Sequence, residues 1–126
     1  MPVKNWSDDI LLVELSNDPI FTEEIVAAIE QIEKGPAQDC VLSFQSVTFI
    51  NSSNLAKLLK LRRMMIENDR QLRLCCINSH AWGVFLATGL DKIFEFADDV
   101  TMALASLELA RHAARAEEQE RTAPGD

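Results

Sequence analysis

The sequence lacks the short motifs that mark the commonest enzyme sites. It contains no Gly-rich phosphate loop, no G-x-S-x-G turn around a nucleophilic serine and no H-E-x-x-H metal helix. These absences argue against independent catalysis. We therefore predict a protein that is not an enzyme, with no catalytic residue, no metal site and no cofactor.

Long apolar segments and an excess of basic residues are also missing. No apolar run approaches the roughly 20 residues that span a bilayer, and residues 1–10 lack the apolar core of a signal peptide. We therefore expect no membrane insertion and a cytoplasmic location. Lys and Arg number 12 against 20 Asp and Glu, and the formal net charge is -8. This balance argues against direct nucleic-acid binding and favours a protein partner.

Cysteine is scarce and its spacing does not suit a zinc site. Cys40, Cys75 and Cys76 lie in apolar, strand-like runs without the paired spacings of zinc ligands. We interpret them as reduced residues of the core. If the chain is extended there, neighbouring Cys75 and Cys76 point to opposite faces of a sheet.

The chain is long enough for one compact core and too short for two ordinary domains. It has 126 residues, of which 48% are hydrophobic. The last ten residues are polar apart from Ala123 and include Pro124-Gly125, so burial cannot offset the entropy of ordering them. We predict one domain over residues 1–116 and a disordered acidic tail over residues 117–126.

Strand-like and helix-like segments alternate along this domain. Strands are predicted over residues 10–15, 40–50, 72–77 and 93–96, and helices over residues 22–35, 55–68, 79–89 and from 98 or 99 to about 115. Thr22 marks the first helix start, Phe21 and Val26 have the spacing of a hydrophobic staple, and Gly89 suits a helix end. The order predicts an α/β fold with a single mixed, largely parallel sheet of about four to five strands and about four helices.

The junction after the second predicted strand carries two adjacent hydroxyls. Asn51-Ser52-Ser53-Asn54 stands where an apolar strand ends and a helix-forming segment begins. Serine caps helices well, and the positive end of the helix dipole also favours an added phosphate. Taken alone, both serines are more often caps than modification sites, and Ser52 is the better capping candidate.

The helix that follows has two stripes of different character. One stripe, predicted to face the sheet, consists of Leu55, Leu58, Leu59, Arg62, Met65 and Ile66. The other consists of Lys57, Lys60, Leu61 and Met64, which mixes two cations with apolar side chains. This second stripe suits a partner contact. It equally suits solvated lysines beside apolar residues that touch a neighbouring element.

The segment Asn51-Ser52-Ser53-Asn54-Leu55 resembles the Asp-Ser-Ser-Gly-Leu helix start of STAS domains, the fold of bacterial anti-anti-sigma factors. The resemblance extends from about Ile10 to Leu107. It includes the helix start Ser79-His80-Ala81, where Ser79 is expected to be the cap, the turn Thr88-Gly89-Leu90 and the segment Ile93-Phe94. Asn51 replaces the family's Asp and Asn54 its Gly.

This resemblance implies a phosphorylation-controlled anti-sigma factor antagonist. In that family, an anti-sigma factor serine kinase phosphorylates the second serine, and a serine phosphatase reverses the reaction. The unmodified domain sequesters the kinase and so regulates transcription. Ser53 is then the phosphorylation site, with Ser52 as the alternative. The expected partner-binding residues are Asn51, Ser52, Ser53, Asn54, Lys57, Lys60, Leu61 and Met64.

Two other functions are compatible with the same residues. STAS domains also occur as cytoplasmic regulatory subunits of lipid-transporting ABC complexes, without phosphorylation, so this role is the alternative. A serine hydrolase using Ser52 or Ser53 is a third possibility, although the sequence offers no evident base for it.

Overall fold

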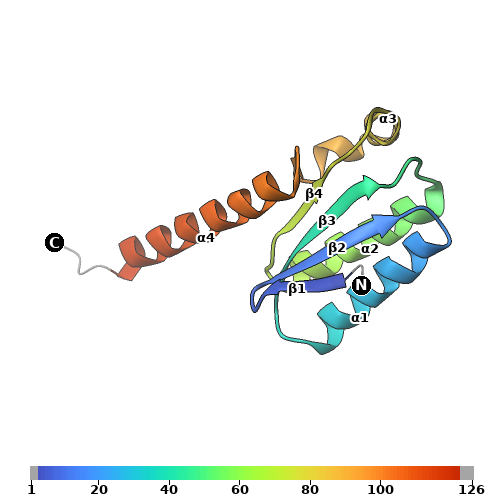
Figure 1. The fold of residues 1–126 in the computed structure, drawn as a ribbon. Helices are drawn as coiled ribbons and strands as arrows, with labels where there is room; N and C mark the ends of the chain where they lie inside the picture. The colour runs from blue at the N-terminus through green and yellow to red at the C-terminus, as the bar shows by residue number, and fades with distance from the viewer. Residues whose placement is uncertain (1–2, 123–126) are drawn as a thin grey trace.

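A computed structural model describes residues 3–122 and contains one five-stranded sheet with four helices (Figure 1). The strands are β1 (Val3–Ser7), β2 (Ile10–Ser16), β3 (Asp39–Ser46), β4 (Leu72–Cys75) and β5 (Phe96–Ala97). The helices are α1 (Ile20–Lys34), α2 (Ser52–Glu67), α3 (Ser79–Thr88) and α4 (Val100–Thr122), with the short 3₁₀ helix η1 (Leu90–Lys92). Within residues 3–122, no helix is long and apolar enough to cross a membrane.

The sheet has the strand order β1-β2-β3-β4-β5. β1 runs antiparallel to β2, whereas β2, β3, β4 and β5 pair in parallel. This arrangement confirms the predicted mixed, largely parallel sheet. β1 itself was not foreseen, because residues 3–7 contain too few apolar side chains for a strand signal.

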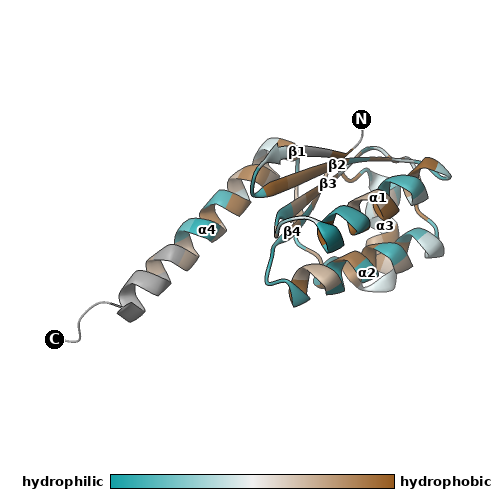
Figure 2. Cartoon of the chain, turned by 90° about the horizontal axis from the view of Figure 1, so that it is seen from below, coloured by the Kyte–Doolittle hydropathy of each residue, from teal (hydrophilic) through white to brown (hydrophobic). Residues whose placement is uncertain are grey.

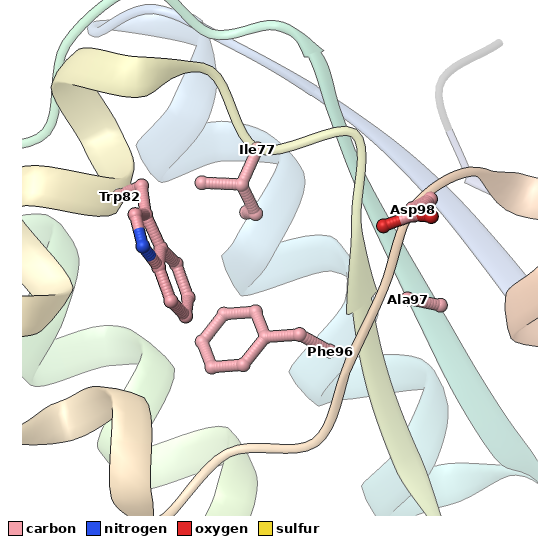
Figure 3. A pocket seen from close by; sticks show the side chains of 5 residues that line it. All are labelled: Ile77, Trp82, Phe96, Ala97 and Asp98. Atoms are coloured by element: carbon pink, nitrogen blue, oxygen red, sulfur yellow. The ribbon is translucent and has the colours of Figure 1, made fainter.

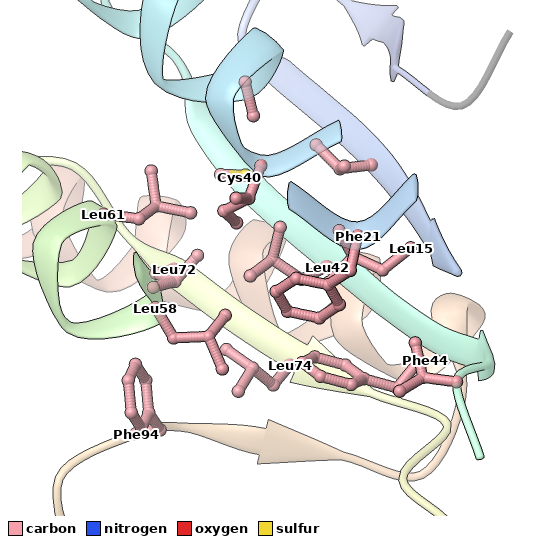
Figure 4. Packing of buried hydrophobic residues seen from close by; sticks show 14 of the residues in the cluster. Leu15, Phe21, Cys40, Leu42, Phe44, Leu58, Leu61, Leu72, Leu74 and Phe94 are labelled. Atoms are coloured by element: carbon pink, nitrogen blue, oxygen red, sulfur yellow. The ribbon is translucent and has the colours of Figure 1, made fainter. Parts of the chain in front are cut away.

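The larger core lies between one face of the sheet and helices α1, α2 and α3 (Figures 1 and 4). Leu11, Val13 and Leu15 point to this face from β2, as the period of two along a strand requires. Four apolar residues at helical spacing are buried on α1: Ile25, Ala28, Ile29 and Ile32. Phe44 and Phe85 are fully enclosed, and their ring centroids lie 6.2 Å apart. Burial of this aliphatic and aromatic surface is the main stabilising contribution here.

Helix α4 covers the opposite face of the sheet, and its C-terminal part extends beyond the sheet (Figures 1 and 2). Ala103 and Leu107 pack in a second cluster with Leu12, Val41 and Cys75. The Asp99 side chain accepts a hydrogen bond from the Met102 N–H at 2.8 Å, so the predicted helix start is confirmed.

The last helix is longer than the sequence predicted. Its end was expected near Arg115, yet α4 continues to Thr122, so residues 117–122 of the expected tail are helical. Glu, Gln and Arg, which dominate this stretch, are good helix formers that need no buried face to extend an existing helix. Residues 123–126 of the expected tail lie outside the described residues.

Several predicted boundaries need correction. α1 begins at Ile20, two residues before Thr22, and Val26 is 41% exposed, so it forms no staple with buried Phe21. Asn78, not Ser79, caps α3, because its side chain accepts from the Ala81 N–H at 2.8 Å. The last strand is β5 at 96–97, preceded by η1. Gly89 ends α3 with a φ of 75°, as predicted.

The aromatic centre of the larger core predicts a large cost for truncating Phe85. Its ring centroid lies 5.2 Å from that of Phe96 and 6.1 Å from that of Phe94. Phe85→Ala should lower the free energy of unfolding by about 3–5 kcal/mol because it opens a cavity. The neighbouring Leu86 is 51% exposed, so Leu86→Ala should change the free energy of unfolding by no more than about 0.5 kcal/mol. Urea unfolding followed by circular dichroism measures both, and equal effects would contradict this description of the core.

Candidate functional site

Three loops meet at the carboxyl edge of the parallel strands. They follow β2, β3 and β4, and they comprise residues 17–19, 47–51 and 76–78. Asn17 and Thr48 exchange two hydrogen bonds of 2.9 Å, one through the Thr48 backbone N–H and one through its hydroxyl. The Asn78 amide donates to the Val47 carbonyl oxygen at 2.9 Å. Two asparagines from neighbouring loops therefore hold the loop after β3 in place.

These hydrogen bonds explain why the second predicted strand ends early. Residues 47–50 are apolar and were assigned to the strand, but β3 stops at Ser46. Val47 and Ile50 are buried in the larger core, whereas Phe49 is 47% exposed. The side chains of Asn17 and Asn78 replace the strand partners that the backbone of this loop would otherwise need.

Asn51 and Asn54 fix the start of α2 by capping each other's backbone. The Asn51 side-chain oxygen accepts from the Asn54 N–H at 2.8 Å, and the Asn54 side-chain oxygen accepts from the Asn51 N–H at 3.1 Å. This is a capping box built from two asparagines. Asn51 is therefore the cap, and the expectation that Ser52 caps the helix is wrong.

The Asp18 carboxylate joins the starts of α1 and α2. One of its oxygens accepts from the side-chain amides of Asn51 and Asn54, both at 2.9 Å. The other accepts from the Thr22 hydroxyl at 2.8 Å and from the Thr22 N–H at 3.2 Å. Hydrogen bonds from Asn51, Asn54 and Thr22 hold the pKa of Asp18 below its ordinary value of 3.8. The charged form of Asp18 is thus the one that the site stabilises.

Ser52 and Ser53 occupy the first turn of α2 and are exposed. Backbone N–H groups in a first helical turn have no acceptor within the helix, and the helix dipole is positive there. The Lys57 ammonium donates to the Ser53 hydroxyl oxygen at 2.8 Å. An anionic group on Ser53 would therefore meet favourable charge from the helix and from Lys57.

The face that α2 buries differs from the predicted one. Its buried residues are Asn54, Leu58, Leu61 and Met65, whereas Leu59 and Ile66 are 38% and 58% exposed. Leu61 faces the core because α2 packs against the sheet with α1 beside it, and a neighbouring helix extends the apolar surroundings to that side.

Two of the expected partner contacts must therefore be corrected. Leu61 is 0% exposed and Asn54 is 1% exposed, so neither offers its side chain to a partner. Ser53, Lys57, Lys60 and Met64 follow one another at helical spacing, and Lys60 is exposed while Lys57 and Met64 are half-buried. Together with exposed Asn51 and Ser52, these side chains form the accessible part of the predicted surface.

Two exposed apolar residues beside the turn escaped sequence analysis. Phe49 lies two residues before Asn51, and Ile20 lies two residues after Asp18, with exposed fractions of 47% and 48%. Phe49 had been assigned to the strand predicted over residues 40–50, whereas Ile20 lay between the predicted elements. A change of backbone direction after β3 exposes Phe49, and hydrophobic periodicity carries no signal for such a change.

A shallow pocket of about 240 Å³ lies at the same edge of the sheet, between α3 and the strand that ends at Ala97 (Figure 3). Ile77, Trp82, Phe96, Ala97 and Asp98 line it. The rings of Trp82 and Phe96 meet edge to face, with centroids 5.0 Å apart. The pocket lies beside the loop after β4 and is separate from the turn at the start of α2 in its lining residues.

The bridging role of Asp18 predicts a pH-dependent loss of stability. Asp18→Asn should lower the free energy of unfolding at neutral pH by about 1–3 kcal/mol, because the single oxygen of a neutral amide cannot accept both from the two asparagines and from Thr22. The folded-state pKa of Asp18 lies below 3.8. The stabilisation is thus complete above the unfolded-state pKa and is lost as pH falls through the folded-state pKa.

Urea unfolding at a series of pH values measures the difference in the free energy of unfolding between the wild type and Asp18→Asn. That difference should shrink as the pH falls below 3.8. Asp8→Asn is the control, since Asp8 is exposed. A difference that persisted at low pH, or one no larger than the control's, would contradict the role assigned to Asp18.

Comparisons with known proteins agree on one family. The family model of the STAS domain matches residues 3–103. A variant of RsbS from Moorella thermoacetica superposes with a TM-score of 0.75 at 18% identity, covering 87% of this chain and 97% of that one. A putative anti-sigma factor antagonist from Thermotoga maritima gives a TM-score of 0.69 at 18% identity, with 85% and 93% covered. For an anti-sigma-factor antagonist (STAS) domain protein from Planctomyces limnophilus, the TM-score is 0.73 at 12% identity, with 84% and 96% covered.

The matched range runs from β1 into the first turns of α4 and includes the whole turn from Asn51 to Leu55. Because their sequence identities with this chain are low, the three solved structures support only the fold. The assignment to a family rests on the match with the family model. The chain belongs to the STAS domain family, as the resemblance of its serine-containing turn predicted.

Proposed function

We propose that this chain is an anti-sigma factor antagonist of the bacterial cytoplasm, a non-enzymatic module that sequesters an anti-sigma factor serine kinase. Phosphorylation of Ser53 releases the kinase, and a serine phosphatase restores binding. The observation that carries this proposal is the exposed Ser53 in the first turn of α2, 2.8 Å from the Lys57 ammonium. The structural relatives whose names include anti-sigma factor antagonist support the same class of function.

The surroundings of Ser53 suit a phosphate that leaves the fold intact. A phosphoserine adds about 1.5–2 negative charges, which the helix dipole and Lys57 stabilise rather than oppose. The capping box of Asn51 and Asn54 does not involve the Ser53 hydroxyl. The phosphate would therefore act outward on a docked partner, by charge and by bulk, without unfolding the start of α2.

The accessible side chains around Ser53 define the proposed docking surface. It comprises Phe49, Asn51, Ser52, Ser53, Lys57, Lys60 and Met64. Phe49 provides an exposed aromatic ring of the kind that anchors protein interfaces. Lys57 and Lys60 add positive charge to this surface on a chain whose net charge is -8, which favours a partner surface with local negative charge. Asn54 is buried beneath this surface and fixes the turn through its hydrogen bond to the Asn51 N–H.

Phosphorylation should occur on Ser53 and not on Ser52. A candidate anti-sigma factor serine kinase supplied with ATP should add about 80 Da to the tryptic peptide of residues 35–57, which holds both serines. Fragmentation of the peptide assigns the site. Ser53→Ala should abolish the mass increase, and Ser52→Ala should retain it. Modification that persists in Ser53→Ala would refute Ser53 as the acceptor.

A negative charge at Ser53 should weaken kinase binding by at least about tenfold, which corresponds to about 1.4 kcal/mol. Ser53→Asp imitates the charge, and isothermal titration calorimetry with the same kinase measures the affinity. Ser79→Asp is the matched control, because it places the same charge in the exposed first turn of α3, outside the docking surface. Equal affinities for Ser53→Asp and the wild type would overturn the proposed switch. Stable association with a lipid-transporter ATPase instead would favour the alternative function.

A further inference from the structure

Cys75 and Cys76 lie side by side at the end of β4, with their sulfur atoms 3.8 Å apart. The sequence suggested that an extended chain would send them to opposite faces of the sheet. That expectation is wrong, because Cys76 has a φ of 62° and leaves the extended conformation. Both side chains pack in the cluster beneath α4, where Cys75 is buried and Cys76 is half-buried.

The backbone at Cys76 is unusual and is held in place by its neighbours. A left-handed backbone at a residue with a side chain is sterically unfavourable, and it is rare outside glycine, asparagine and aspartate. The Cys76 N–H donates to the Asp98 carbonyl oxygen at 3.2 Å, which fixes this conformation against the segment after β5. The result brings two thiols into contact on one side of the chain.

We propose that Cys75 and Cys76 form a redox-active pair that closes reversibly into a disulfide between neighbouring residues when it meets a peroxide. Neither thiol has a part in the proposed phosphoswitch. The third cysteine, Cys40, is buried on the opposite face of the sheet in the larger core, so it does not compete for either sulfur.

The two cysteines have different roles in this reaction. Cys76 is half-buried, so an oxidant reaches it first. Burial raises the pKa of Cys75 to about 12, with the neighbouring Cys76 as a further cause, so Cys75 stays protonated and attacks second. Direct contact between the sulfurs compensates for the low reactivity of Cys75, since the attack is intramolecular.

The reaction balances with hydrogen peroxide as the oxidant. The Cys76 thiol gives up its proton as its sulfur attacks one peroxide oxygen; the O–O bond breaks, the departing hydroxide takes that proton and leaves as water, and Cys76 becomes a sulfenic acid. The Cys75 sulfur then attacks the Cys76 sulfur; the S–S bond forms, the S–O bond breaks, and the departing hydroxide takes the Cys75 proton and leaves as a second water. The two thiols lose two electrons and two protons, and the peroxide is reduced to water. A dithiol reductant reverses the change by exchange.

Forming the disulfide requires a local movement of the chain at Cys75 and Cys76, and this movement should extend to the neighbouring pocket. The sulfurs must approach from 3.8 Å to about 2.05 Å. Cys76 precedes Ile77 and is bonded to the backbone of Asp98, and both of these residues line the pocket of Figure 3. Neighbouring α-carbons are closer than most disulfides allow, about 3.8 Å against about 4.4–6.8 Å, so the closed pair should be easily reduced.

Mass spectrometry of tryptic peptides tests the proposal directly. Trypsin leaves Cys75 and Cys76 together on residues 74–92, whereas Cys40 lies on residues 35–57. After treatment of the folded full chain with hydrogen peroxide, peptide 74–92 should lose about 2 Da and should resist alkylation. Treatment with a phosphine reductant before digestion should restore the original mass and the uptake of two alkyl groups.

Cysteine variants distinguish a disulfide between Cys75 and Cys76 from other oxidation products. Cys76→Ser should abolish the loss of mass, and the matched Cys40→Ser should leave it unchanged. If a variant fails to fold, the mass of the wild-type peptide 74–92 still tests the proposal, because both sulfurs are on that peptide. A gain of oxygen mass on peptide 74–92 in place of the loss, or a disulfide between two chains, overturns the proposal. Unmodified thiols under conditions that oxidise free cysteine also overturn it.

Discussion

The carboxylate of Asp18 is the constraint on which the geometry of the site depends. It accepts hydrogen bonds from Thr22 at the start of α1 and from Asn51 and Asn54 at the start of α2. Two helices that are distant in sequence therefore begin at fixed positions relative to one charge. Because Asn54 is buried and committed to this network, the neighbouring Ser53 is free to face outward. The charge of this partly exposed carboxylate thus determines which of several polar residues the turn presents.

The fold and the position of the site could be predicted because their signals are local. Continuous apolar runs in β2 and β3 indicate strands buried on both faces, and the spacing of Ile25, Ala28 and Ile32 indicates the buried face of α1. Strands that alternate with helices imply parallel pairing, which places the serine-containing turn at the carboxyl edge of the sheet. Each of these inferences uses only residues close together in the chain.

The details that escaped prediction depend on contacts between distant segments. Asn51 takes the capping role expected of Ser52 because its amide also reaches Asp18, which lies 33 positions earlier. Leu61 becomes a core residue because α1 lies beside α2, which no pattern within α2 reveals. Phe49 is exposed because Asn17 and Asn78 turn its loop out of the strand. Sequence periodicity describes a face of an element but not the neighbours that it meets.

The two edge strands of the sheet are poorly suited to pairing with strands of another molecule. On one side, β1 is antiparallel and has an irregular register between Asn5 and Ser7. On the other, β5 offers only Phe96 and Ala97 for pairing. A bulged strand and a very short one are poor templates for the backbone of another molecule. The strands at both borders are therefore protected from joining those of other copies, and contacts between molecules are left to side chains.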